Sequence, residues 1–149
     1  MWRLFRGLQI VTDKTQLIEG LNEHAPGFIR MLGGRIVDVD LEQASCVFEF
    51  NISKDFCHSI DIVQGGFITA MLDAAMSHAI FAVDQSITAV SSLEIKTSYL
   101  APTRAGCLRV EGRVIKASYK TAFFEGSITN SEGELTATSS SVAKLGRAK

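Results

Sequence analysis

Asp73 is the residue of this sequence whose type and surroundings most clearly suit a chemical role. It carries the single formal charge between residues 62 and 83, in a stretch of otherwise apolar and small side chains. Burying an unpaired carboxylate costs several kcal/mol or forces the group to take up a proton. The stretch therefore predicts either a core carboxylate that a neighbouring group satisfies, or a desolvated general base or nucleophile.

Two further features of the stretch bear on this carboxylate. Thr69, Asp73 and Ser77 stand four residues apart, so they share one face if the stretch is helical. Gly65 and Gly66 stand at its start, where uncovered N–H groups at the positive end of a helix would suit a phosphate or a developing oxyanion. A plain turn of two glycines is the alternative interpretation.

The spacing between Gly65 and Asp73 limits any role that they share. Eight residues cover about 12 Å of helix, at 1.5 Å per residue. That distance is too long for both to touch one reacting carbonyl group, so a shared role requires Asp73 of one subunit to meet Gly65 of another. A catalytic interpretation therefore predicts antiparallel pairing of two such helices in a two-fold homodimer.

The elements that must position these residues form one α+β domain over residues 1–149. Apolar residues at helical spacing mark 13–32, with an interruption at Pro26, and 65–84 is predicted to be one long helix. Period-two alternation predicts two strands between 36 and 51 and four strands after the long helix. Since no β-α-β alternation occurs, we expect one antiparallel sheet wrapped around the long helix. An N-terminal helical segment over 1–32 and a frayed tail over 146–149 complete the prediction.

Composition narrows the class of protein. Hydrophobic residues make up 46% and charged residues 21%, which is typical of a globular chain. A net charge of -1 gives no reason to expect binding to nucleic acid or to a membrane. Three scattered cysteines without CxxC spacing argue against a disulfide framework or a metal site and indicate a reducing, cytoplasmic location. The start of the chain is broken by Arg3 and Arg6, so no signal peptide is expected.

Residues 63–77 carry a resemblance to a known family. Their sequence, Val-Gln-Gly-Gly-Phe-Ile-Thr-Ala-Met-Leu-Asp-Ala-Ala-Met-Ser, resembles the helix signature of hotdog-fold acyl-CoA thioesterases of the PaaI-like, phenylacetate-degradation-related group. Residues 92–102 resemble the strand that follows this helix in that group, and 133–137 resemble its final turn and strand. The resemblance spans about residues 30–145 and implies the hotdog fold, an antiparallel sheet around one long helix.

The resemblance implies hydrolysis of an acyl-CoA between the subunits of a homodimer, which in this group often pairs into a tetramer. It makes Asp73 the catalytic carboxylate, which activates water or attacks first to form a mixed anhydride. It gives the amide that polarises the thioester carbonyl to Gly65. A helping hydroxyl falls on Ser92, or on Ser91 if the loop differs by one residue, or on Ser77 as in other members. No metal or organic cofactor is implied, and coenzyme A enters as part of the substrate.

This sequence departs from the pattern of the group at three positions. Gln64 replaces a histidine, His58 replaces an asparagine and Asp61 replaces a glycine. Gln64 can donate and accept hydrogen bonds but cannot act as an acid or base. His58 brings a titratable group, and either contacts the carbonyl or is an ordinary surface residue. We expect Gln64 and His58 to shape the pocket.

Further residues are expected to contact the substrate. The phosphates of coenzyme A favour basic groups at the pocket mouth, although charges at strand ends are more commonly just solvated. Apolar lining is expected from the start of the long helix and the next strand, with core packing as the alternative. The expected substrate-binding residues are Gly66, Phe67, Tyr99, Arg104, Lys116, Ser118 and Lys120, with Met71 as additional apolar lining.

Two other functions compete with hydrolysis. The same fold could bind an acyl-CoA as a sensor or carrier without turnover, and the loss of the group's histidine and asparagine fits that hypothesis. Asp73 argues against it, because a silent binder has little use for a carboxylate that faces a thioester. A hotdog dehydratase would need an Asp and His pair at a spacing that this sequence lacks.

Overall fold

The N-terminal part of the chain is helical and is divided by a proline. The computed structural model describes residues 2–149, with side chains from Asp13 onward. Met1, the first residue of the predicted N-terminal segment 1–32, lies outside the described residues. Helix α1 (Trp2–Glu23) is followed by α2 (Gly27–Met31), whose N-cap is Pro26. Proline lacks an amide hydrogen and disfavours helical backbone at the preceding residue, so the helix breaks at the predicted interruption.

A six-stranded antiparallel sheet contains all of the alternating segments. Its strand order is β1-β2-β4-β5-β6-β3, so β1 and β3 are the edge strands. The predicted order of two strands, one long helix and four strands is confirmed. The strands are β1 (Gly34–Asp40), β2 (Ser45–Ile52), β3 (Ile87–Tyr99), β4 (Gly106–Ala117), β5 (Thr121–Asn130) and β6 (Leu135–Arg147), and a short 3-10 helix, η1 (Lys54–Phe56), follows β2.

The last strand is longer than the sequence indicated. A frayed tail was expected over 146–149, but β6 continues to Arg147, which lies opposite Ile87 at the start of β3. The Arg147 guanidinium forms an ion pair with Asp84, at 2.9 Å, and lies 4.5 Å from the centroid of the Tyr119 ring. The first two residues of the expected tail are therefore ordered by strand pairing and by side-chain contacts.

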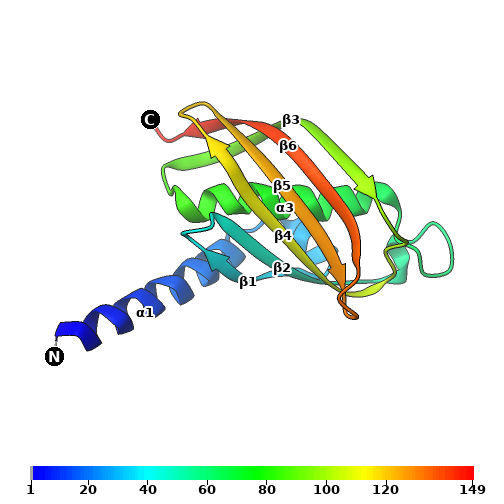
Figure 1. Ribbon diagram of the computed structural model, residues 1–149, viewed down its shortest axis with the longest axis horizontal. Helices are drawn as coiled ribbons and strands as arrows, with labels where there is room; N and C mark the ends of the chain where they lie inside the picture. The colour runs from blue at the N-terminus through cyan, green and yellow to red at the C-terminus, as the bar shows by residue number, and fades with distance from the viewer. Residues whose placement is uncertain (1) are drawn as a thin grey trace.

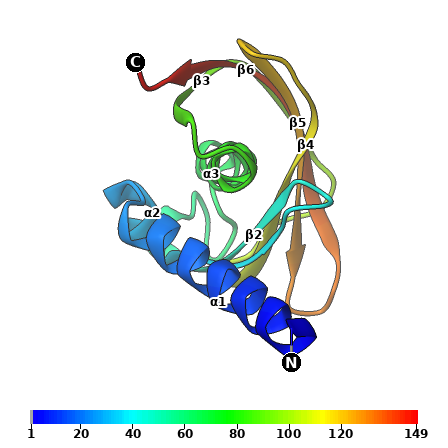
Figure 2. The same ribbon diagram turned by 90° about the vertical axis from the view of Figure 1, so that its left-hand side faces the viewer.

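The long helix α3 (Gly65–Val83) lies in the hollow of the curved sheet (Figure 2). Its length and apolar composition would also allow it to cross a membrane, but ten of its side chains are buried in the protein core. The helix packs so closely on β4 that a Cβ atom at Gly112 would lie 2.2 Å from the backbone carbon of Ala75. An antiparallel sheet wrapped around one central helix is the hotdog fold, as predicted.

Strand β3 has one unpaired side. It pairs with β6 along its length, and no strand lies along its other side in the part of the chain that the structure describes. Figure 1 shows β3 running beside α3 and ending near the N-terminus of that helix. A 13-residue open edge presents a row of free backbone groups with which another strand can pair.

Candidate active site

The N-terminus of α3 presents a free backbone amide. Gln64 is the N-cap, and its side-chain oxygen accepts a hydrogen bond from the Gly66 N–H at 2.7 Å. The Phe67 and Ile68 N–H groups donate to the Gln64 carbonyl oxygen. The Gly65 N–H has no acceptor among the described residues. Because it lies at the positive end of the helix, it is suited to bind an oxygen that gains negative charge.

The end of β3 fixes the position of this amide. The Tyr99 hydroxyl donates to the Gly65 carbonyl oxygen at 2.9 Å and lies 3.2 Å from the Thr69 hydroxyl. The Thr69 hydroxyl is in turn 2.8 Å from that of Thr97. A Cβ atom at Gly65 would lie 3.0 Å from the Tyr99 hydroxyl oxygen, so the site has little room for a side chain there. Sequence reasoning missed Thr97, because no local signal shows that it faces α3.

Asp73 is held by a serine of β3. The Ser92 hydroxyl donates to Asp73 Oδ1 at 2.8 Å. This contact distinguishes Ser92 from Ser91, which has no side-chain hydrogen bond to Asp73. Asp73 and Ser77 are both half-buried, and the bond from β3 gives the Asp73 carboxylate a partner on a neighbouring strand. The polar face of α3 borders β3 and is not covered by the rest of the sheet.

A cavity of about 620 Å³ opens at the N-terminus of α3. Apolar side chains and backbone of the loops on either side of the helix start complete its wall, among them Ile62, Val63 and Leu100. Asp73 does not line this cavity, in agreement with its separation of eight residues from Gly65 along α3. The predicted site residues that the cavity brings together are His58, Gln64, Gly65, Gly66 and Tyr99.

Two predicted substrate contacts lie beside this cavity with other partners. The Arg104 guanidinium forms an exposed ion pair with Asp61, with Nη1 to Oδ1 at 2.7 Å. Asp61 stands where the PaaI-like pattern has glycine, so this departure supplies a partner for Arg104. The Phe67 ring packs edge-on against Phe56, with centroids 4.9 Å apart. Met71 is fully buried, so it belongs to the core.

Three other predicted contacts lie far from the cavity. Lys116, Ser118 and Lys120 are in or beside the turn between β4 and β5, at the opposite end of the sheet from the α3 N-terminus (Figure 1). The 12 residues of β4 cover roughly 40 Å at 3.3 Å per residue, which separates this turn from the cavity. Within one chain, the structure does not bring these three residues to the candidate site.

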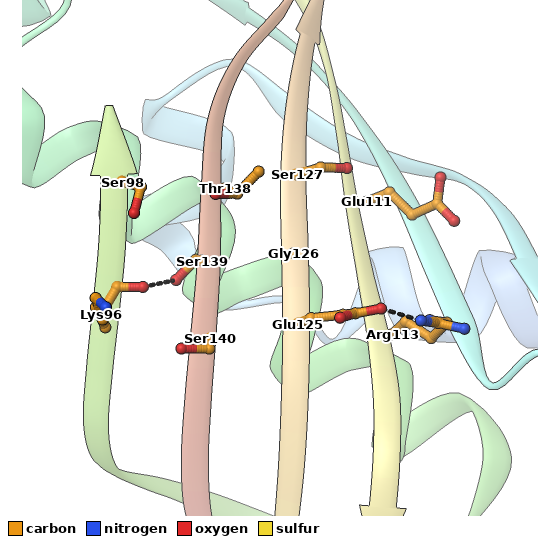
Figure 3. A pocket seen from close by; sticks show the side chains of 10 residues that line it. All are labelled: Lys96, Ser98, Glu111, Arg113, Glu125, Gly126, Ser127, Thr138, Ser139 and Ser140. Carbon is orange, nitrogen blue, oxygen red and sulfur yellow. Dashed lines mark hydrogen bonds and ion pairs between the residues drawn. The ribbon is translucent and has the colours of Figure 1, made fainter. Parts of the chain in front are cut away.

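A separate hollow of about 400 Å³ lies on the outer face of the sheet. Figure 3 shows side chains of four neighbouring strands around it, with Lys96, Ser140, Glu125 and Arg113 in one cross-strand row. Glu125 and Arg113 form an ion pair within this row. None of the predicted site residues lines this hollow, so it is distinct from the candidate active site.

The buried cysteine, Cys46, offers no second reactive centre. All three cysteines are free, and Cys46 is fully buried. Burial raises the pKa of the Cys46 thiol to about 12, so it stays protonated and is a poor nucleophile at neutral pH. Among the described residues, no group of three or more histidine, cysteine or acidic side chains is arranged to hold a metal ion.

The fold and the site together define a hotdog protein with a free helix-terminal amide and a serine-bonded carboxylate. The family model of the thioesterase superfamily matches residues 61–137, and the chain belongs to this superfamily. The matched region runs from the loop before α3 into β6, so it includes Gly65, Asp73 and Ser92.

Solved structures agree with this assignment. A phenylacetic acid degradation-related protein of Ralstonia eutropha JMP134 has 29% identity and a TM-score of 0.75, over 80% of this chain and 90% of that one. The PaaI protein of the E. coli phenylacetic acid degradation operon has 17% identity and a TM-score of 0.77, over 92% and 95%. Thioesterase HI1161 of Haemophilus influenzae has 18% identity and a TM-score of 0.77, over 87% and 90%. The resemblance to the PaaI-like group is thereby confirmed.

Proposed function

We propose that this protein hydrolyses acyl-CoA thioesters in active sites that form between two subunits. The observation that carries the proposal is the hydrogen bond from Ser92 to Asp73, on the face of α3 that the sheet leaves uncovered. A half-buried carboxylate that a serine orients is arranged as a general base or nucleophile. The free Gly65 N–H supplies the complementary group for the thioester oxygen.

A two-fold dimer would bring these two groups together. In one chain they are about 12 Å apart along α3, because eight residues separate them. The open edge of β3 lies beside the polar face of α3, so pairing two chains along β3 would place two α3 helices side by side and antiparallel. Asp73 of one subunit would then face Gly65 of the other.

Hydrolysis in such a site follows from these groups. Asp73 accepts a proton from a water molecule while the water oxygen attacks the thioester carbon, and Gly65 N–H stabilises the negative charge on the carbonyl oxygen. The carbon–sulfur bond then breaks, and the coenzyme A thiolate leaves and takes up a proton. In the alternative path, Asp73 attacks first and water hydrolyses the resulting mixed anhydride. In both paths, the hydrogen bond from Ser92 holds the Asp73 carboxylate in its orientation.

The proposal gives supporting roles to the residues around the helix start. Gln64 holds the Gly66 N–H, which leaves the Gly65 N–H as the free amide, and His58 lines the pocket. Arg104 lies near the mouth, where a phosphate of coenzyme A could exchange for Asp61 as its partner. Neither a metal nor an organic cofactor takes part. A reducing cytoplasm would suit the free cysteines.

A non-catalytic acyl-CoA-binding protein is the second candidate. The observation that favours it is the side chain of Gln64, which stands at the histidine position of the group, cannot transfer a proton, and caps its own helix. The thioesterase and the non-catalytic binding protein would use the same acyl-CoA site, and they differ only in whether the thioester is hydrolysed.

Hydrolysis of a panel of short, long and aromatic acyl-CoAs, followed through the released thiol, tests the proposal. The wild-type protein should turn over at least part of the panel, and Asp73→Asn should lose 10²-fold or more in kcat, since it removes the base but keeps the shape of the side chain. Equal rates for the two proteins would show that the mechanism is wrong. Binding without any turnover would favour the second candidate.

A further inference from the structure

Thr69 lies on the same face of α3 as Asp73, one turn nearer to the start of the helix, and the proposed mechanism gives it no part. Its hydroxyl contacts two others, both from β3, that of Thr97 at 2.8 Å and that of Tyr99 at 3.2 Å. The Tyr99 hydroxyl in turn donates to the Gly65 carbonyl oxygen at 2.9 Å. Three side chains thus form one hydroxyl chain, Thr97–Thr69–Tyr99, that ends at the backbone of the helix start.

The hydrogens of this hydroxyl chain can satisfy its three contacts in only one way. A hydroxyl group has one hydrogen to donate, whereas a carbonyl oxygen only accepts. The Tyr99 hydrogen goes to the Gly65 carbonyl, so the contact between Tyr99 and Thr69 must use the hydrogen of Thr69. The contact between Thr69 and Thr97 must then use the hydrogen of Thr97. All three hydrogens therefore point along the chain toward Gly65, and hydrogen bonds aligned in this way strengthen one another.

The peptide groups on both sides of Gly65 are held. Before it, the Gln64 carbonyl oxygen accepts hydrogen bonds from two N–H groups of the first helical turn. After it, the Gly66 N–H donates to the Gln64 side chain at 2.7 Å, and the Gly65 carbonyl oxygen accepts from Tyr99. Of these partners, Tyr99 is the one that comes from the sheet and not from α3 or its cap. The hydroxyl chain therefore ties Gly65 to β3.

Gly65 depends on such a tie because glycine has a more variable backbone than any other residue. A side chain cannot supply the restraint, since a Cβ atom there would lie 3.0 Å from the Tyr99 hydroxyl oxygen and 3.1 Å from Cζ of the ring. The direction of the Gly65 N–H is thus left to hydrogen bonds. A donor stabilises a developing negative charge best when it already points at the place where that charge forms.

We infer that Tyr99 and Thr69 are positioning residues for the amide of the proposed thioesterase. Tyr99 holds Gly65 so that its N–H points at the thioester oxygen, and Thr69, oriented by Thr97, holds the Tyr99 hydroxyl. The inference rests on the proposed function and explains how its amide is kept in place. Because the hydroxyl chain acts through Gly65, its loss should lower the rate of the chemical step and leave substrate binding unchanged.

Tyr99→Phe tests the last bond of the chain, because it removes the hydroxyl and keeps the ring in the wall of the cavity. With the best acyl-CoA of the panel, kcat should fall at least about tenfold and KM should stay within about twofold, as expected for a misdirected amide. Ser98→Ala is the matched control, since it removes a hydroxyl of the same strand that lines the hollow of the outer face (Figure 3). A loss of kcat no larger than in this control would overturn the role of Tyr99.

A double-mutant cycle tests the order of the chain. Thr69→Val removes the hydroxyl and keeps the shape of the side chain, and it should lower kcat about fivefold in the wild-type protein. In the Tyr99→Phe protein the same substitution should change kcat less than about twofold, because no hydroxyl is left for Thr69 to hold. Losses that simply multiply in the double variant would show that Thr69 does not act through Tyr99.

The position of the amide can also be measured without turnover. Nuclear magnetic relaxation should give the Gly65 N–H an order parameter of about 0.85 in the wild type and in Ser98→Ala, and below about 0.6 in Tyr99→Phe. Equal order parameters, or turnover that Tyr99→Phe leaves unchanged, would overturn the inference and leave the thioesterase standing. Loss of order in Tyr99→Phe, in a protein that turns over no acyl-CoA, would remove the thioesterase and still show that Tyr99 holds the amide.

Discussion

Asp73 combines partial burial with one hydrogen-bond partner, and this combination determines what its carboxylate can do. Ser92 holds Oδ1, while Oδ2 has no partner among the described residues and remains free to accept a proton from water. A carboxylate with both oxygens bonded to the protein would be a structural group. In the proposed mechanism, Oδ1 is therefore the oriented oxygen and Oδ2 is the reacting one.

Replacement of Ser92 provides the sharpest test at this scale. Ser92→Ala should lower kcat about tenfold to a hundredfold with little change in KM, because a carboxylate displaced by about 1 Å loses that much rate while binding is untouched. Steady-state kinetics on the best acyl-CoA of the panel would measure the effect. Ser91→Ala is the matched control, since Ser91 is exposed and should stay within twofold. Equal losses in the two variants would contradict the assignment.

The sequence alone indicated much of this site but not how its parts meet. Asp73 and Gly65 stood out because a charge and a glycine pair are local anomalies in an apolar stretch. The choice of Ser92 over Ser91 depends on the register between β3 and β6, which shifts at a bulge between Ser92 and Glu94. Such a register is set by packing between distant segments, and no local pattern records it.

At the scale of elements, the end of α3 is fastened to the ends of β3 and β6 by one cluster. Asp84, the C-cap of α3, accepts hydrogen bonds from the Ser86 hydroxyl at 2.6 Å and the Ser86 N–H at 3.0 Å, and it pairs with Arg147. The Ser86 hydroxyl and then Arg147 lower the pKa of Asp84 to about 2. The last strand is thereby joined to the turn that follows the central helix.

This cluster predicts a pH dependence of stability. A carboxyl group whose pKa is lower in the folded than in the unfolded chain stabilises the fold above its unfolded pKa, near 4, and loses this contribution as the pH falls to about 2. Asp84→Asn should therefore unfold at lower urea concentration than wild type at pH 7. The two midpoints should converge as the pH falls from about 4 to about 2.

Urea unfolding curves of both proteins across this pH range would provide the measurement. Glu132→Gln is the matched control, because Glu132 is an exposed carboxylate that forms no ion pair with the described residues. A gap between wild type and Asp84→Asn that stays constant from pH 7 to about pH 2 would show that the ionised carboxylate does not stabilise the fold.

The elements themselves were largely predictable from the sequence, and the exceptions share one cause. Alternation and helical spacing are local, so they located α3 and the strands. Arg147 lies 63 residues from Asp84, and a tail that such a contact orders looks unstructured from its own residues. Lys116 and Lys120 form a plausible basic patch in sequence, but the direction and length of β4 place them at the far end of the sheet.

At the scale of the whole molecule, the proposed active site is divided between subunits. The described chain leaves an edge strand unpaired and a polar helix face uncovered on the same side. Each feature alone would be a liability for a monomer, because open edges invite unspecific pairing. Together they match the geometry that a two-fold dimer needs in order to join Asp73 with Gly65.

Mixing two inactive variants tests this division directly. Asp73→Asn and Gly65→Ala should each be nearly inactive alone, the latter because its methyl group meets Tyr99. When the two are co-refolded in equal amounts, half of the dimers pair unlike chains, and each of these has one intact site of two. About a quarter of wild-type activity should therefore return in a thiol-release assay.

The opposite result is equally informative. If both groups act within one chain, no mixture of the two variants regains activity, whatever the degree of exchange. Light scattering on the mixture and on each variant alone confirms that dimers are present, so a failure to assemble cannot be mistaken for a failure to complement.

The N-terminal helix lies apart from the residues of the proposed active site. Helix α1 precedes every strand, and Asn22, near its end, exchanges two hydrogen bonds with the backbone of Ile36 on β1. The residues that bear the proposed chemistry lie on α3 and β3, whereas a cavity of about 1080 Å³ lies between α1 and the end of α3. One wall of this cavity and the groups of the proposed chemistry therefore lie on separate stretches of the chain. Substitutions in the first 26 residues can therefore reshape this cavity and leave the residues of the proposed chemistry in place.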